Sequence, residues 1–366
     1  MNNALNLLYE ELLSFSGLGP LLDMYHKNDY SALHSFRGIL SAISPVIPLL
    51  LVIEIGRALV YRRFRIEDYR MPFFVFVANR FLSRFIRIAA VAFCISLFSR
   101  FAFVRTSFTW YWFLFGYVIW ELAHFVYHYL GHKVRLFWCL HSTHHAPEAM
   151  NLSVTYMHFF LEAPYADVIR TSICILAGVN PPMLFLIMAI DGTWGAFIHV
   201  GDGFISDARM GALGRMILTP SHHRVHHARN PLYIDTNFCN LLNIWDRVFR
   251  TYQPEDRAIK IEYGITRPVK TRSFWDMYFG EFVCLGRDMV RAPGLGNKLL
   301  YLVMPPGWSH TGEHKTARVM KRSVALAGHE DAAGSEGRIA RRGGSTGERS
   351  QAFVATGGDH AGKNKT

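Results

Sequence analysis

The chain has 366 residues, of which 51% are hydrophobic, 14% aromatic and only 18% charged, with a formal net charge of +11. This is more apolar surface than an ordinary soluble core requires, and it favours a membrane protein. The positive charge could indicate nucleic-acid binding, but no helix-turn-helix, zinc-finger or aromatic-basic RNA motif accompanies it. We therefore attribute the excess of Lys and Arg to segments that flank membrane spans, and expect no nucleic-acid partner.

Three apolar segments are long enough to cross a bilayer as helices, which takes roughly 20 residues; they lie at about 38–60, 86–104 and 108–130. Residues 61–85 contain six arginines, whereas the next loop is only Arg105-Thr106-Ser107. Lys and Arg concentrate in loops on the cytoplasmic side. We therefore expect the region after Leu130 to be cytoplasmic and the protein to be an integral, multi-pass membrane protein.

A later apolar region, about 168–200, is divided by Asn180-Pro181-Pro182, which is a strong turn signal. It is predicted to be a helical hairpin that dips into the membrane and returns. Residues 274–290 and 299–306 are predicted to be amphipathic segments at the interface. The fold class is therefore all-α, with an N-terminal segment (1–37), a membrane domain with a cytosolic helical cap (38–310) and a disordered basic tail (311–366).

Histidines provide the clearest chemical signal, because 12 of the 18 lie between His124 and His227. Residues three or four apart share one face of a helix, so an HxxxH or HxxHH motif can direct at least two imidazoles at one ion. Eight nitrogens exceed the four ligands of zinc and suit two metal ions, and such a set can hold two irons. The three motifs contain His128, His132, His141, His144, His145, His223, His226 and His227.

Other residues in this region are candidates for supporting roles. His158 and His199 lie near the same predicted interface and are further candidate metal ligands; His222, beside the third motif, has a similar case, and His124 a weaker one. Carboxylates should orient the rings from outside the ligand set. Glu121, about two helical turns before His128, is the natural candidate, and the weaker ones are Asp202, Glu162, Asp235 and Asp246.

Several classes of protein are disfavoured by what the sequence lacks. There is no HExxH zincin motif, and no GxGxxG or GxxxxGK[ST] nucleotide-binding loop. Electrons would therefore come from an external donor such as a reductase, a cytochrome, a ferredoxin or a pterin. A metal transporter would place its histidines along the spans, and a haem protein would use pairs that face each other from different spans, so both are less favoured.

The three motifs resemble those of the fatty acid hydroxylase/sterol desaturase superfamily, whose pattern is HxxxH, HxxHH and a second HxxHH. The resemblance implies a membrane-embedded helical base and a cytosolic cap, with a diiron centre held by the eight motif histidines. It also aligns His158 and His199 with histidines common in that pattern. The stretch from Thr219 to Tyr252 is most similar to the alkylglycerol monooxygenase branch, which implies tetrahydrobiopterin as a possible reductant.

Together these observations predict a membrane-bound, O₂-dependent diiron monooxygenase that hydroxylates a C–H bond of a lipid. The alternative is a sterol or lipid desaturase that uses the same two irons. The substrate is expected to enter from the bilayer between the aromatic segment 108–130 and the hairpin. Ether lipids, sterols and acyl chains of polar lipids all remain possible substrates.

Overall fold

The computed structural model describes residues 5–7, 9–10, 13, 16–31, 36–82, 84–205 and 208–326. Among them, every regular element is a helix, and β pairing is limited to isolated bridges. The prediction of an all-α chain is confirmed. The elements are α2 (Gly19–Lys27), α3 (Phe36–Ile43), α4 (Val46–Val60), α5 (Ile66–Leu82), α6 (Arg84–Phe98), η2 (Ser99–Phe101), α7 (Trp110–Lys133), α8 (Arg135–His145), η3 (Leu152–Tyr156), α9 (Glu162–Leu176), α10 (Pro181–Phe197), η4 (Leu213–Arg215), α11 (Pro220–His226), α12 (Ile244–Val248), α13 (Phe274–Arg291) and α14 (Gly294–Val303).

One helical segment of the described residues, Gly38–Val60, is by itself long and apolar enough to cross a membrane, with a mean hydropathy of 2.2. It comprises most of α3 together with α4. The segments Ile66–Arg80 and Phe85–Phe101 reach the same standard only as a pair bent by 60°. Length and composition therefore identify the first predicted span, and the second only as part of this bent pair.

The third predicted span coincides with α7, which is 24 residues long and so about 36 Å. Glu121, His124 and His128 lower its apolar character, and much of its surface is covered by protein. Tyr117, Trp120 and Ala123 belong to a buried apolar cluster shared with α9 and α10. Packed side chains therefore occupy this part of the interface between α7 and the hairpin, where substrate entry was expected.

The predicted hairpin is present as α9 and α10, although α9 begins six residues earlier than expected, at Glu162. Asn180 caps α10 by accepting a hydrogen bond from the backbone N–H of Met183, and Pro181 and Pro182 occupy the first turn. Proline suits this position because the first backbone N–H groups of a helix have no partner within the helix. The predicted turn is confirmed, and its residues explain where α10 starts.

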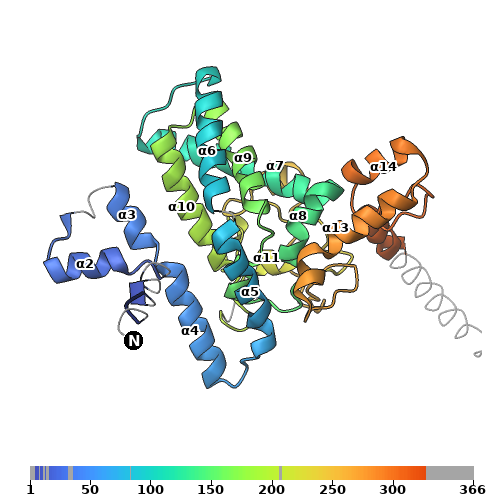
Figure 1. The fold of residues 1–366 in the computed structure, drawn as a ribbon, viewed down its shortest axis with the longest axis horizontal. Helices are drawn as coiled ribbons and strands as arrows, with labels where there is room; N and C mark the ends of the chain where they lie inside the picture. Colours follow the sequence, from blue (N-terminus) through green and yellow to red (C-terminus); the bar gives the residue numbers. More distant parts are fainter. Residues whose placement is uncertain are drawn as a thin grey trace, which may run out of the picture. The chain divides into compact units, whose positions relative to one another are not determined.

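Helix α6 runs parallel to α9, and Figure 1 shows the two beside α10. Near their N-terminal ends, Arg87 Nε donates to Asp167 Oδ2 at 2.8 Å. Beyond their C-terminal ends, the N–H of Phe103 donates to the carbonyl of Leu176 at 2.8 Å. Helices α6, α9 and α10 thus form a three-helix layer. One end of this layer is the tip of the hairpin, and the other end lies beside the histidine motifs.

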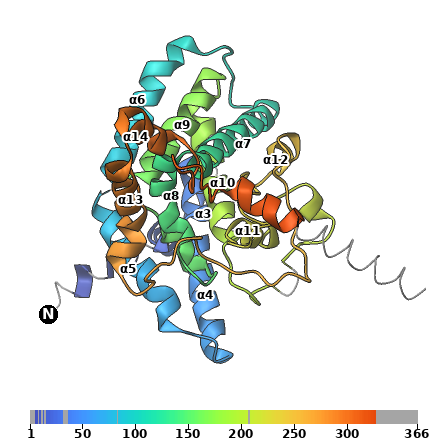
Figure 2. The ribbon, with the colours of Figure 1, turned by 90° about the vertical axis from the view of Figure 1, so that its right-hand side faces the viewer.

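The helices that carry the histidine motifs meet at the other end of this layer. Figure 2 shows α7, α8, α10 and α11 converging in the middle of the first compact unit, residues 1–319. Helix α11 has only seven residues and starts with a capping box between Thr219 and His222. So short a helix is marginal alone, and its burial among the other elements holds it in place.

The C-terminal part of the chain contains the two predicted amphipathic segments as α13 and α14. Both pack against α8 through Leu285, Ala292 and Tyr301, while Trp275 and Val290 are exposed on α13. Residues 317–326 are helical. The remainder of the predicted disordered tail, residues 327–366, lies outside the described residues.

Replacing Gly178 by alanine should destabilise the fold. Gly178 has φ +88°, and a Cβ there would lie 1.9 Å from the carbonyl oxygen of Val104. The positive φ and the clash together cost at least about 2 kcal/mol. Gly192→Ala, on the same hairpin with open space around it, is the matched control and should be neutral or slightly stabilising. Thermal unfolding in detergent measures both, and equal midpoints for the two variants would contradict the assignment.

Candidate metal centre

Nine buried histidines form two groups whose ring nitrogens could each hold a metal ion. Within each group, one nitrogen of every residue lies within 4.8 Å of the corresponding nitrogens of the others. Every one of these residues is at most 7% exposed. Group A consists of His128, His132, His141, His145 and His226, and group B consists of His144, His199, His223 and His227.

The two groups are neighbours because two helices contribute to both. His144 and His145 are consecutive on α8, and their rings therefore point to different groups. His226 and His227, at the end of α11, divide in the same way. The rings of His145 and His227 stack across the boundary with centroids 4.3 Å apart. Each HxxHH motif thus contributes to both groups, and HxxxH contributes to group A alone.

In group A the hydrogen bonds direct nitrogen lone pairs toward one another. His128 Nδ1 lies 2.8 Å from the carbonyl of Phe238, and His141 Nδ1 lies 2.6 Å from Glu162 Oε1. Carbonyl and carboxylate oxygens only accept, so each Nδ1 carries the proton and each neutral ring has its lone pair on Nε2. The two Nε2 atoms nevertheless lie 3.1 Å apart. Two lone pairs at this distance repel each other unless a metal ion or a proton lies between them.

His226 extends this pattern. Its Nδ1 lies 2.8 Å from the carbonyl of Thr236, which leaves Nε2 as the acceptor. The buried Nε2 atoms of His226 and His132 have no hydrogen-bond partner among the described residues. Buried polar atoms are rarely left unpaired, and a metal ion would satisfy both.

Group B repeats the arrangement around His199. Its Nδ1 lies 2.6 Å from the carbonyl of Gly195, so its Nε2 carries a lone pair. That Nε2 lies 3.1 Å from Nε2 of His144 and 2.9 Å from Nε2 of His223. Two ligand nitrogens that each lie about 2.1 Å from one metal ion, with a right angle between the two bonds, are about 3 Å apart. The spacing therefore fits donors that share an ion.

Burial favours the neutral form of an imidazole, which is the form that binds a metal ion. It lowers the pKa of His145, His226 and His227 well below the ordinary value, and the neighbouring histidines lower it further. The pKa of His132 falls to about 4 because burial outweighs the hydrogen bond with Asp235. At neutral pH the free ring nitrogens of these four histidines are thus available as ligands without first releasing protons.

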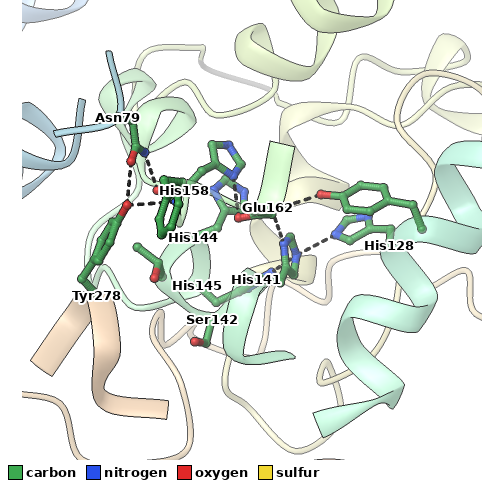
Figure 3. A network of polar contacts seen from close by, with 12 residues as sticks. Asn79, His128, His141, Ser142, His144, His145, His158, Glu162 and Tyr278 are labelled. Carbon is green, nitrogen blue, oxygen red and sulfur yellow. Dashed lines mark hydrogen bonds and ion pairs between the residues drawn. The ribbon is translucent and has the colours of Figure 1, made fainter. Parts of the chain in front are cut away.

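Glu162 connects the two groups (Figure 3). One carboxylate oxygen accepts from His141 Nδ1, and the other lies 2.9 Å from Nδ1 of His158. Burial alone would raise the pKa of Glu162, but His158 and His141 hold it well below its ordinary value. The His158 ring in turn stacks on His144 of group B, with centroids 4.4 Å apart and planes inclined by 9°. Glu162 therefore orients a group A ligand and a ring that packs on group B.

Asp235 has a similar role at His132. Its carboxylate accepts from His132 Nδ1 at 3.3 Å and also pairs with Lys133. Phe238, three residues later, is fully buried and packs against the rings of His128 and His132. The loop that follows α11 thus contributes an orienting carboxylate and an apolar cover for group A.

Glu121, the natural carboxylate candidate, and Asp202, one of the weaker ones, have other partners. Glu121 does not contact a histidine, but accepts from the backbone N–H groups of Asn240, Leu241 and Leu242. Asp202 pairs with Arg224 at 3.0 Å and accepts from the hydroxyl of Tyr263. These two predictions are corrected because each carboxylate is used to hold backbone or an arginine. Glu162 and Asp235 orient the rings instead.

Among the further histidines, the structure brings His199 into group B but leaves His158 outside both groups. His158 has its Nδ1 held by Glu162 and its ring face against His144, so its nitrogens do not converge with the others. His124 lies 3.6 Å from Asp191, and His222 bonds to Thr219 and Tyr252. These three have structural partners that sequence spacing alone does not reveal.

Replacing Glu162 by glutamine should weaken metal binding. The amide has one acceptor oxygen where the carboxylate has two, so either His141 or His158 loses its acceptor. Changes to groups that orient ligands typically reduce metal affinity about 10–100-fold. Competition against a chelator, with the detergent-solubilised chain, measures that affinity.

The matched control is Glu281→Gln, since Glu281 is another buried carboxylate but pairs with Arg267 instead of a histidine. It should leave metal affinity unchanged. Unaltered affinity in Glu162→Gln, or equal weakening in both variants, would show that Glu162 does not orient a ligand.

Comparison with known proteins agrees with this geometry. Residues 113–251, which include both groups, match the family model described as fatty acid hydroxylase. Alkylglycerol monooxygenase of Danio rerio is 31% identical over 190 residues, 52% of this chain and 41% of the relative. The enzyme of the same name from Caenorhabditis elegans is 34% identical over 195 residues, 50% of this chain and 37% of the relative.

A bacterial relative, ornithine lipid hydroxylase OlsE of Rhizobium tropici, is 27% identical over 154 residues, 42% of this chain and 45% of the relative. The chain thus spans less than half the length of these curated relatives. No solved structure matches it. Residues 113–251 resemble the fatty acid hydroxylase family, and the resemblance of the chain to that superfamily and to its alkylglycerol monooxygenase branch is confirmed.

Proposed function

We propose that this chain is a membrane-bound, O₂-dependent monooxygenase that hydroxylates a C–H bond of a lipid. The observation that carries the proposal is the pair of adjacent, buried groups of five and four imidazole nitrogens. The reaction would place one oxygen atom of O₂ in the lipid and release the other as water, using two electrons and two protons from a donor. Relatives named alkylglycerol monooxygenase and ornithine lipid hydroxylase support a lipid substrate.

The donor set favours iron over a structural zinc ion. Zinc in structural sites takes four ligands and commonly includes thiolates, but none of the cysteines joins either group among the described residues. Two irons, one held by group A and one by group B, would supply the redox chemistry that O₂ activation requires. A single haem is disfavoured because the other imidazoles of each group occupy the space that a porphyrin needs.

The protein side chains would position the ions and keep water away. Glu162 and Asp235 fix the orientation of His141 and His132. Phe238 covers group A, and Trp138 packs against the ring of His132 with centroids 5.2 Å apart. An apolar cover of this kind limits side reactions of an oxidising site with water. The chain therefore contributes orientation and exclusion of solvent.

The membrane arrangement is part of the proposal. Gly38–Val60 would span the bilayer, and the arginine-rich segment 61–85 that follows would lie on the cytoplasmic side. The histidine-bearing helices would then form a cap on that side, with further apolar helices embedded in a multi-pass base. Electrons would come from an external reductase, cytochrome, ferredoxin or pterin, tetrahydrobiopterin being the donor that the alkylglycerol monooxygenase resemblance suggests.

A desaturase is the alternative reaction for the same pair of ions. It would remove two hydrogens from the lipid where the hydroxylase adds one oxygen. The names of the relatives favour hydroxylation, and the mass change of the product distinguishes the two reactions directly.

Expression of the chain in aerated cells should therefore generate lipids that are heavier by one oxygen atom. His226→Ala in group A and His144→Ala in group B should reduce this product to background, because each removes a buried ligand. His26→Ala, at an exposed position on α2, is the matched control and should retain activity. Lipidomics by mass spectrometry provides the measurement.

Two results would count against the proposal. A lipidome identical with and without the wild-type chain, under oxygen and with the metal loaded, would contradict lipid oxidation. Products lighter by two hydrogens would replace hydroxylation by desaturation.

A further inference from the structure

A cavity of about 680 Å³ lies between α5, α6, η3, α9 and α10. Its volume falls in the range of sites that hold small molecules. Ile88, Val91, Ala92 and Ile95 line it from α6, at the spacing of one helical face. This face extends about 10 Å along the helix. Met188 of α10 also lines the cavity.

The cavity changes from polar to apolar along α6. Because α6 and α9 are parallel, Arg87 and its partner Asp167 lie toward the histidine end of the layer, and Ile95 lies toward the hairpin tip. Ile95 and Met188 pack against the same buried apolar cluster. Polar groups that line the cavity, including Asn79 and His158, gather at the end near Arg87. The cavity is thus amphipathic, with its polar end at the metal centre.

His158 is the point at which the cavity meets both histidine groups. Figure 3 shows it between Asn79 and His144, with Asn79 Nδ2 donating to its backbone carbonyl. Its side chain is 33% exposed, and its ring stacks on His144. An occupant at the polar end of the cavity would therefore be separated from group B by a single imidazole ring.

We propose that this cavity binds the hydrocarbon chain of the lipid substrate, with the tail toward Ile95 and Met188 and the polar end toward His158. This rests on the proposed function and assigns substrate selection to α6. An unbranched chain fits the straight stripe of α6, whereas a fused sterol ring system is disfavoured. Ala92 is the residue at which the cavity can be shortened most simply, because its small side chain lies in the middle of the stripe.

Photolabelling tests occupancy without turnover. The full chain, metal-loaded in nanodiscs, is labelled with a palmitic acid that carries an aliphatic diazirine, and the labelled peptides are mapped by mass spectrometry. Wild type should be labelled within residues 88–95 and 185–188. Ala92→Phe should reduce that labelling about tenfold, because the larger side chain occupies space that the hydrocarbon chain would fill. Ala89→Phe makes the same change on α6 at a residue that is exposed like Ala92 but lies outside the cavity lining, and should label like wild type.

The chain-length distribution of oxidised lipids provides the second readout. Ala92→Phe should shift the products toward shorter chains while iron content stays at the wild-type level. Labelling elsewhere in the chain, or equal labelling of all three proteins, would overturn the proposal, as would unchanged product lengths in Ala92→Phe. If the label maps to the cavity but no variant oxidises lipid, the cavity assignment stands and the proposed function fails.

Discussion

Neutral imidazoles that direct their lone pairs at one another are the feature on which the rest of this protein depends. His128 and His141 approach through Nε2 atoms 3.1 Å apart, each with its other nitrogen committed to an oxygen acceptor. When both rings are neutral, no proton remains on them to form a hydrogen bond between the two Nε2 atoms. Nine such residues, all buried, would be an unfavourable core without shared cations. The fold is therefore best understood as a scaffold that brings metal ligands together.

Two buried carboxylates hold the loop that orients these rings. Glu121 accepts from three consecutive backbone N–H groups of residues 240–242, and Asp246 accepts from those of Phe238 and Cys239. The same loop supplies the carbonyls of Thr236 and Phe238 to ligand histidines. Glu121 thus acts on the metal centre through the backbone. The two carboxylates are buried, and the backbone N–H groups that they accept from have no alternative partner among the described residues. The position of the loop therefore depends on Glu121 and Asp246.

Much of the centre could be predicted from sequence because helical spacing is a local property. HxxxH and HxxHH place imidazoles on defined helix faces, and all eight motif histidines belong to the two groups. His199 follows α10 and reaches group B only because the hairpin packs beside the motif helices. Its position in the sequence therefore suggested a metal ligand but could not establish one. His158 has the same kind of position, yet Glu162 four residues later draws its nitrogen away.

The parts that were not predictable depend on tertiary contacts. Backbone carbonyls such as that of Gly195 orient ligand rings, and they carry no sequence signal. Asp235 adopts a positive φ of 58°, which allows it to reach His132 from a loop that is distant in sequence. Sequence does not show which aromatic residues of α7 face protein: Tyr117 and Trp120 pack against α9 and α10, whereas Trp110 and Tyr111 are exposed. The hairpin turn at Asn180 was predictable because proline and asparagine act locally.

The iron content of the purified chain and its histidine variants tests the central claim most directly. Elemental analysis should give two irons per chain for wild type and also for His158→Ala, which removes a ring outside both groups. His226→Ala and His144→Ala should each bind less iron than wild type, because each removes a ligand from one group. Unchanged iron content in these two variants, or a wild-type chain that takes up no iron, would contradict the account.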